Sequence, residues 1–203
     1  MLKQSGPLKK IQQSIGRTLA TIPLTPNQWT ITSLLLALIA GLAIALTGQL
    51  AAGLALFTIA AIFDAIDGAV ARARGQVTKM GGFIDGVADR FVEATFLISL
   101  MFIPLPTIFI DPKIWLAILV FTGTCMPSFI RAYAEHKGVI SKEKAHSLGG
   151  ICERSERLAI IVLALGAGIF MGMEYFIYGA ILAIFLSIVT IIQRLVWIGQ
   201  PNV

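Results

Sequence analysis

Four aspartates lie in two short stretches of an otherwise apolar part of the chain: Asp64 and Asp67 in one, Asp85 and Asp89 in the other. The first two are three residues apart and the second two are four apart, so on α-helices each pair shares one face. An ionised side chain at membrane depth is costly unless it is paired, hydrated or bound to a cation. Four carboxylates from adjacent helices would repel one another, and one or two divalent cations are the simplest agent that stabilises such a cluster.

The residues beside the first aspartate pair leave room for a ligand. Gly68 and Ala71 keep this helix face bare, which lets either a bulky ligand or another helix approach closely. Arg72 lies one turn beyond Gly68, where a guanidinium can pair with the carboxylates or hold a phosphate. The polar linker between Arg72 and Gly81 is long enough to turn the chain. We therefore expect the two helices to be antiparallel, with the aspartate pairs facing each other.

Composition places the chain in a membrane. Of its 203 residues, 57% are hydrophobic and 13% are charged, and the mean hydropathy is +0.85. Such values are typical of a polytopic membrane protein, so the predicted fold class is all-α. The net charge of +5 comes mostly from basic residues between apolar stretches, so we expect contacts with lipid or phosphate and no nucleic-acid partner. Cys125 and Cys152 support neither a disulfide framework nor a zinc site.

Six transmembrane helices are predicted, separated by polar or proline-containing segments. They cover residues 29–45, 51–74, 81–103, 114–133, 156–171 and 175–197, and Pro127 is expected to kink the fourth. Apolar residues at three- to four-residue spacing in residues 7–20 predict an N-terminal amphipathic helix in the membrane interface. Residues 1–203 are thus interpreted as one membrane domain, with an interfacial segment over 1–28 and a six-helix bundle over 29–197.

Basic residues predict the orientation. Six spans place both termini on one side, and nearly all lysines and arginines outside the spans fall in the segments of that side; Lys113 alone faces the other. Because basic loops remain in the cytoplasm, we expect a multi-pass protein of the cell membrane with both termini and the mouth of the aspartate site cytoplasmic.

The aspartates and their neighbours match the signature D-x-x-D-G-x-x-A-R-x8-G-x-x-x-D-x-x-x-D without a gap or substitution. In these residues the chain resembles the CDP-alcohol phosphotransferase (CDP-alcohol phosphatidyltransferase) family. The resemblance extends over essentially the whole chain, because the family also has six spans and an N-terminal interfacial helix. It implies a two-metal enzyme that transfers a phosphate-linked lipid from a CDP-lipid, such as CDP-diacylglycerol or CDP-archaeol, to an alcohol and releases CMP in phospholipid biosynthesis.

The resemblance also implies roles for individual residues. Asp64, Asp67 and Asp85 would hold two divalent ions, Mg²⁺ or Mn²⁺, and Asp89 would be both a ligand and the general base for the acceptor hydroxyl. The CDP-lipid would be held by Asn27, Gln28, Trp29, Thr30, Gly68, Arg72 and Thr78. On pattern alone, Asn27 and Thr30 would instead be helix-capping residues, and Thr25 or Asn27 could cap the first span.

The acceptor is predicted from three basic positions. The branch of the family that uses inositol phosphate resembles this chain at Arg131, at the element Glu153-Arg154-Ser155-Glu156-Arg157-Leu158, and at Gln193-Arg194. Arg131, Arg157 and Arg194 would suit a phosphomonoester dianion. The alternative is that all three are topology determinants whose side chains reach the interface. Tyr133 stands where that branch usually has a second arginine.

Two other functions fit parts of the sequence. Within the family, the acceptor could be glycerol 3-phosphate or another polar alcohol rather than inositol phosphate. Outside it, a non-catalytic divalent-cation transporter would explain the aspartates but neither Arg72 nor the Pro26-Asn27 element, and the chain shows no internal repeat. The resemblance further implies a homodimer.

Overall fold

The computed structural model describes residues 18, 19 and 21–200, which are predominantly helical and contain no β-strand. The all-α prediction is therefore confirmed. The chain divides into two compact units, Leu2–Pro104 and Leu105–Val203. Most of the predicted interfacial helix over residues 7–20 lies outside the described residues, so that helix stays a prediction.

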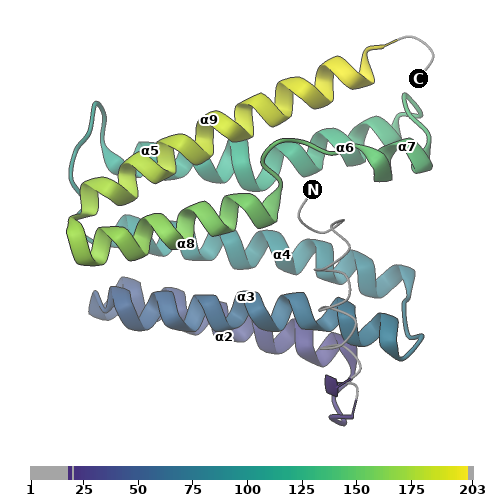
Figure 1. Cartoon of the computed structure of the whole chain (residues 1–203), viewed down its shortest axis with the longest axis horizontal. Helices are drawn as coiled ribbons and strands as arrows, with labels where there is room; N and C mark the ends of the chain where they lie inside the picture. The colour runs from purple at the N-terminus through teal and green to yellow at the C-terminus, as the bar shows by residue number, and fades with distance from the viewer. Residues whose placement is uncertain (1–17, 20, 201–203) are drawn as a thin grey trace. The chain divides into compact units, whose positions relative to one another are not determined.

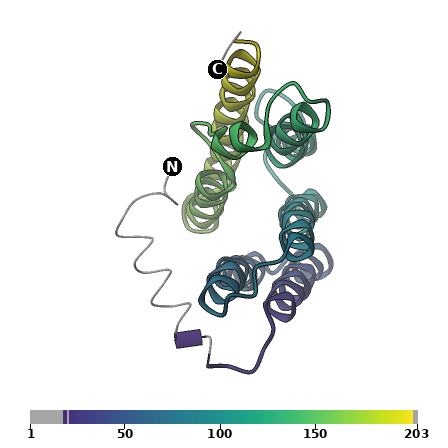
Figure 2. The same ribbon diagram turned by 90° about the vertical axis from the view of Figure 1, so that its right-hand side faces the viewer.

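The first unit contains α2 (Pro26–Thr47), α3 (Leu50–Ala73), α4 (Lys79–Ser99) and the short 3₁₀-helix η2 (Leu100–Phe102). Thr25, rather than Asn27, caps α2: its side chain accepts from the backbone N–H of Gln28, and the Gln28 side chain accepts from the Thr25 N–H at 2.7 Å. Helix α2 packs against both α3 and α4, as Figures 1 and 2 show. It is therefore the support that places the two aspartate-bearing helices.

Aromatic and polar contacts hold the three helices of this unit together. The rings of Phe57 on α3 and Phe96 on α4 are stacked with centroids 3.7 Å apart, and both side chains are fully buried. Between α2 and α3, the buried Ser33 hydroxyl of α2 donates to the carbonyl of Ala60 at 2.9 Å. Because a hydroxyl in an apolar environment needs a partner, this bond also fixes how α2 meets α3.

The second unit begins with α5 (Pro112–Leu119), the π-helix η3 (Val120–Cys125) and α6 (Met126–His136), which form one continuous helical segment. Pro127 lies at the start of α6, and its ring conflicts with the carbonyl four residues earlier, Gly123. The wider π-turn just before it accommodates this conflict. A π-helix thus precedes Pro127 in the structure, while the predicted kink stays a prediction.

Three further helices complete this unit: α7 (Lys142–Ser147), α8 (Arg154–Met171) and α9 (Met173–Ile198). Helix α9 is central, since α5, η3, α6 and α8 all pack against it. The segment before α8 is tied to α9 by side chains: the Cys152 N–H donates to Thr190 Oγ1 at 3.0 Å, and the Ile151 N–H donates to Gln193 Oε1 at 3.1 Å.

The loop before α5 contains a tight turn that the sequence did not predict. Phe109 has φ of 62°, and the Ile110 N–H donates to the Ile108 carbonyl at 2.7 Å, which defines a γ-turn. The same carbonyl accepts from the Trp115 indole N–H at 2.9 Å. This second bond anchors a backbone conformation that bulky residues rarely adopt.

Four helical segments among the described residues are long and apolar enough to cross a membrane: Pro26–Thr47, Leu50–Ala73, Pro112–His136 and Met173–Ile198. The other two predicted spans are observed as helices α4 and α8, but both carry several charged residues, α4 with Asp85, Asp89, Arg90 and Glu93 among them. The membrane class is consistent with these apolar helices, whereas the count of six spans stays a prediction.

Replacing Phe96 with alanine tests the packing of the first unit. It removes a fully buried, stacked ring, so the free energy of unfolding should fall by about 3–5 kcal/mol. Thermal unfolding of the purified protein in detergent measures the change. Phe91→Ala is the matched control on the same helix, because Phe91 is 61% exposed and should have little effect. Equal losses from both substitutions would contradict this packing.

Candidate active site

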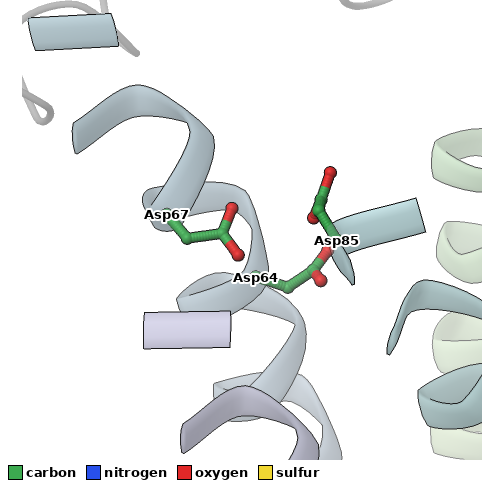
Figure 3. A group of neighbouring side chains, drawn as sticks. All are labelled: Asp64, Asp67 and Asp85. Carbon is green, nitrogen blue, oxygen red and sulfur yellow. The ribbon is translucent and has the colours of Figure 1, made fainter. Parts of the chain in front are cut away.

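Three of the four aspartates converge. Asp64 and Asp67 lie on α3 and Asp85 on α4, and one carboxylate oxygen of each lies within 4.8 Å of the others. Figure 3 shows the three side chains directed toward a common point. Asp67 is only 4% exposed, while Asp64 and Asp85 are half-buried. Carboxylate oxygens are the ligands that Mg²⁺ and Mn²⁺ prefer, and like charges this close favour a cation between them, so the donor set fits a divalent metal ion.

Asp67 has a further partner on a third helix. The hydroxyl of Thr30 on α2 donates to Asp67 Oδ2 at 2.6 Å, and both residues are buried. The same hydroxyl lies 3.2 Å from the Pro26 carbonyl. Helix α2 thus contacts the carboxylate group through a side-chain hydrogen bond as well as through packing.

A cavity of about 470 Å³ opens beside the carboxylates. Its wall combines the start of α2, the end of α3, the linker and the start of α4, and it includes Asp67 and Asp85. Five residues of the predicted CDP-lipid set line it: Asn27, Thr30, Gly68, Arg72 and Thr78. The linker residues Gln76 and Val77 and the small residues Gly81 and Gly82 also line the cavity; sequence reasoning assigned them no role.

Two helix N-termini contribute to this wall, and both suit an anion. Thr25 and Pro26 begin α2, and Thr78 begins α4 by accepting from the Gly81 N–H at 2.9 Å. In α2, Pro26 has no N–H and the Gln28 N–H is bonded to Thr25, so Asn27 supplies the remaining N–H there. The dipole of each helix adds partial positive charge at its N-terminus. A phosphate group would therefore be stabilised at this end of the cavity.

Small residues let cationic and polar groups reach the cavity. At Gly68, an added Cβ would lie 3.3 Å from Nη1 of Arg72, so the guanidinium folds back over the bare helix face. At Gly81, an added Cβ would lie 3.0 Å from the Thr78 hydroxyl and 3.7 Å from Oδ1 of Asn27. The bare face predicted at Gly68 is thus used by the chain's own arginine, which lines the cavity.

Three residues of the predicted site lie elsewhere. Gln28 does not line the cavity, because its side chain belongs to the capping box of α2. Trp29 is 4% exposed and packs on the ring of Phe63 with centroids 5.1 Å apart. Asp89 lies outside the group of three close carboxylates, and its Oδ2 is 3.4 Å from Nη1 of Arg90.

Arg74 is a structural contact that the sequence did not reveal. Its guanidinium donates to the carbonyl of Leu24 at 2.6 Å and to that of Ile22. These bonds tie the segment before α2 to the end of α3, directly beside the cavity wall. Since main-chain carbonyls leave no trace in a sequence pattern, only the basic residue itself could have pointed to this contact.

The three arginines assigned to the acceptor lie in the second unit and differ in their surroundings. Arg131 on α6 is half-buried. Arg157 on α8 is 3% exposed and lies against η3, where a Cβ added to Gly123 would be 2.7 Å from its Cδ. Arg194 on α9 is 6% exposed; it donates to the carbonyls of Pro127 and Gly149, and its Nη2 is 3.9 Å from Glu153. Arg194 therefore also stabilises its own unit.

Comparison with known proteins identifies the family. The sequence matches the profile of the family described as CDP-alcohol phosphatidyltransferase over residues 23–194. It is 36% identical to the archaetidylinositol phosphate synthase of Pyrococcus horikoshii over 197 residues, which covers 96% of this chain and 94% of the relative. It is 31% identical to the phosphatidylinositol phosphate synthase of Corynebacterium glutamicum, covering 96% and 86% of the two chains.

Solved structures agree in fold. The phosphatidylinositol phosphate synthase of Mycobacterium tuberculosis with CDP-DAG bound superposes with a TM-score of 0.76 at 29% identity, covering 95% of this chain and 96% of that one. The same enzyme in complex with manganese and citrate gives a TM-score of 0.75 at 28% identity, covering 94% and 90%.

Removing one carboxylate should weaken metal binding. Asp85→Asn keeps the shape of the side chain but removes a charged ligand, so Mn²⁺ affinity should fall about tenfold or more. Electron paramagnetic resonance of free Mn²⁺ in titrations of the purified protein measures it. Asp111→Asn is the control, because Asp111 lies outside the group and caps α5, where asparagine serves equally well. Unchanged affinity in Asp85→Asn would contradict a metal site here.

Proposed function

Because the chain belongs to the CDP-alcohol phosphatidyltransferase family and is therefore a transferase, we propose that it moves a phosphate-linked lipid from a CDP-lipid to the hydroxyl of a phosphorylated polyol, with inositol phosphate as the favoured acceptor. The observation that supports this most directly is the convergence of Asp64, Asp67 and Asp85 beside a cavity that also contains Arg72 and two helix N-termini. Anion-binding and cation-binding groups side by side suit a metal-bound diphosphate.

The carboxylates would hold the metal. Asp64, Asp67 and Asp85, with Asp89 as an additional ligand, would bind two divalent cations, Mg²⁺ or Mn²⁺. When bound, such ions neutralise the diphosphate and stabilise the entering and leaving oxygens. The manganese complex of the mycobacterial enzyme supports a metal in this fold.

The nucleotide end of the CDP-lipid would lie along the cavity wall. Arg72 offers planar two-point contacts to phosphate oxygens, and the first turns of α2 and α4 offer backbone N–H groups. Asn27 and Thr78 supply further polar contacts, while Gly68 leaves the space that the guanidinium occupies. Gln28 and Trp29 would act on the nucleotide indirectly, by fixing the start of α2.

In the chemical step, one phosphorus–oxygen bond forms while another breaks. The acceptor hydroxyl oxygen attacks the phosphorus that carries the lipid, the bond from that phosphorus to the bridging oxygen breaks, and CMP leaves with the electron pair. Asp89 takes the hydroxyl proton as attack proceeds. Its Oδ2 lies 3.4 Å from Nη1 of Arg90.

The acceptor phosphate would be bound by arginines of the second unit. Arg131, Arg157 and Arg194 supply several fixed cationic donors, as a phosphate dianion requires. The relatives named as inositol phosphate lipid synthases support this choice of acceptor. Glycerol 3-phosphate and other polar alcohols are the alternatives.

We further propose the arrangement in the cell. The protein would form six spans in the cell membrane, with α4 and α8 added to the four apolar helical segments, and it would work as a homodimer. Both termini and the mouth of the cavity would face the cytoplasm, because the basic segments of the chain lie on that side. A soluble sugar phosphate would then enter from the cytoplasm.

An acceptor panel tests the reaction. Purified protein with CDP-diacylglycerol or CDP-archaeol and Mg²⁺ should release CMP with inositol phosphate and much less with free inositol or glycerol 3-phosphate, since the phosphate and ring together would supply the binding contacts.

Chelation of divalent ions should stop CMP release, and addition of Mg²⁺ or Mn²⁺ should restore it. Asp89→Asn, which cannot accept the proton, should be inactive with every acceptor. Full activity in excess chelator would overturn the proposal.

Loss of an acceptor arginine should appear in KM. Arg131→Ala is the clearest case, because within the described chain Arg131 makes no hydrogen bond or ion pair whose loss would disturb the fold. The KM for inositol phosphate should rise about ten- to a hundredfold, the cost of one charge-assisted contact, while the KM for the CDP-lipid changes little. Steady-state CMP release measures both constants. Lys137→Ala, an exposed cation at the end of the same helix, is the control. An unchanged KM for inositol phosphate would mean that Arg131 serves as a topology determinant and does not bind the acceptor.

A further inference from the structure

We infer that Thr30 is a positioning residue for the metal site: its hydroxyl orients the carboxylate of Asp67 as a ligand. This inference rests on the proposed function, since it concerns the same carboxylates. It assigns Thr30 a role other than contact with the nucleotide. The observation behind it is the hydrogen bond from Thr30 Oγ1 to Asp67 Oδ2, at 2.6 Å between two helices.

The position of the Thr30 proton can be decided by comparison with other threonines. In membrane helices, a threonine hydroxyl ordinarily donates to the carbonyl four residues earlier. Five others here do so at 2.5–3.0 Å: Thr32, Thr47, Thr58, Thr122 and Thr190. Thr30 is 3.2 Å from its own carbonyl partner, Pro26, and only 2.6 Å from the carboxylate. A hydroxyl has one proton, and these distances direct it to Asp67.

The short distance is typical of a charge-assisted bond. Hydroxyl-to-carboxylate bonds are about 2.5–2.7 Å long and roughly twice as strong as neutral ones. Thr30 is 5% exposed and Asp67 4% exposed, so little water competes for either group. Asp67 is also the most buried of the three converging carboxylates. It therefore depends more than its neighbours on partners within the protein.

The geometry gives this bond a consequence for metal binding. One carboxylate oxygen of Asp67 accepts the Thr30 hydroxyl, which restricts rotation of the carboxylate and favours presentation of the other oxygen to Asp64 and Asp85. Partners that orient metal ligands in this way typically change metal affinity or activity about ten- to a hundredfold when they are removed. Thr30 also connects α2, which supports both aspartate-bearing helices, directly to the ligand set.

Direct Mn²⁺ titration of hydroxyl variants tests the inference without relying on turnover. Thr30→Val replaces the hydroxyl with a methyl group of the same shape, and Mn²⁺ affinity should fall about tenfold or more, as observed by electron paramagnetic resonance in the absence of CDP-lipid. Thr30→Ser keeps the donor and should retain affinity close to that of the unaltered protein. In activity assays, Thr30→Val should need correspondingly more Mn²⁺ for half-maximal rate.

Ser33→Ala is the matched control. Ser33 lies one turn further along α2, is equally buried, and also donates across to α3, but its partner is the main-chain carbonyl of Ala60. This substitution should lower thermal stability and leave Mn²⁺ affinity unchanged. A loss of affinity in both Thr30→Val and Ser33→Ala would mean that general loosening of α2 is responsible, which would contradict the inference.

The remaining outcomes separate this inference from the proposed function. No Mn²⁺ binding by the unaltered protein would overturn the metal site itself, and with it the proposed chemistry. Equal Mn²⁺ affinity in the unaltered protein and Thr30→Val would overturn only the role of Thr30, and a change confined to CDP-lipid affinity would make Thr30 a nucleotide contact.

If Thr30→Val is unstable, Thr30→Ala, which leaves space for a water molecule beside Asp67, takes its place. Failure of both to fold while Ser33→Ala folds would assign the hydroxyl to the fold and contradict the inference.

Discussion

Convergence of three mutually repelling carboxylates is the constraint on which the first unit depends. Asp64, Asp67 and Asp85 lie within 4.8 Å of one another on helices that are otherwise apolar, and Asp67 is almost fully buried. Packing alone would not favour this arrangement, because each charge loses hydration and gains a like-charged neighbour. The stacked rings of Phe57 and Phe96 and the bonds from α2 hold α3 and α4 in place despite that repulsion. Such strain is expected where a cation is to be bound.

The sequence predicted the features that depend on spacing. Residues three or four apart on a helix share a face, and a short linker makes the following helix antiparallel, so the meeting of Asp64 and Asp67 with Asp85 could be expected from their positions along the chain. The six long helical segments were predicted to within a few residues, because long apolar stretches and their proline and glycine boundaries are strong signals, whereas the short polar helix α7 was not predicted. The same reasoning placed Gly68 and Arg72 beside the carboxylates, where the structure has them.

Features that depend on how helices pack could not be predicted. The bond from Thr30 to Asp67 joins residues 37 apart, and nothing in either local pattern indicates it. Gln28 was assigned to the nucleotide only by resemblance, whereas its side chain completes a capping box that is decided by the conformation of Thr25. Asp89 follows Asp85 by one turn yet lies outside the close group, because helix phase fixes a shared face but not the distance across to α3. The γ-turn at Phe109 is likewise a tertiary effect, anchored by Trp115.

Two arginines donate to main-chain carbonyls. Arg74 donates to the carbonyls of Ile22 and Leu24, and Arg194 donates to those of Pro127 and Gly149. Any amino acid presents a carbonyl, so the identities of the accepting residues are free to drift during evolution. The number of residues in the segment is constrained. One residue inserted or deleted between Leu24 and the start of α2 would rotate the accepting carbonyls away from Arg74 and shift the cavity wall. Selection should therefore act on the length of this segment and, apart from the capping residue Thr25, leave its composition open.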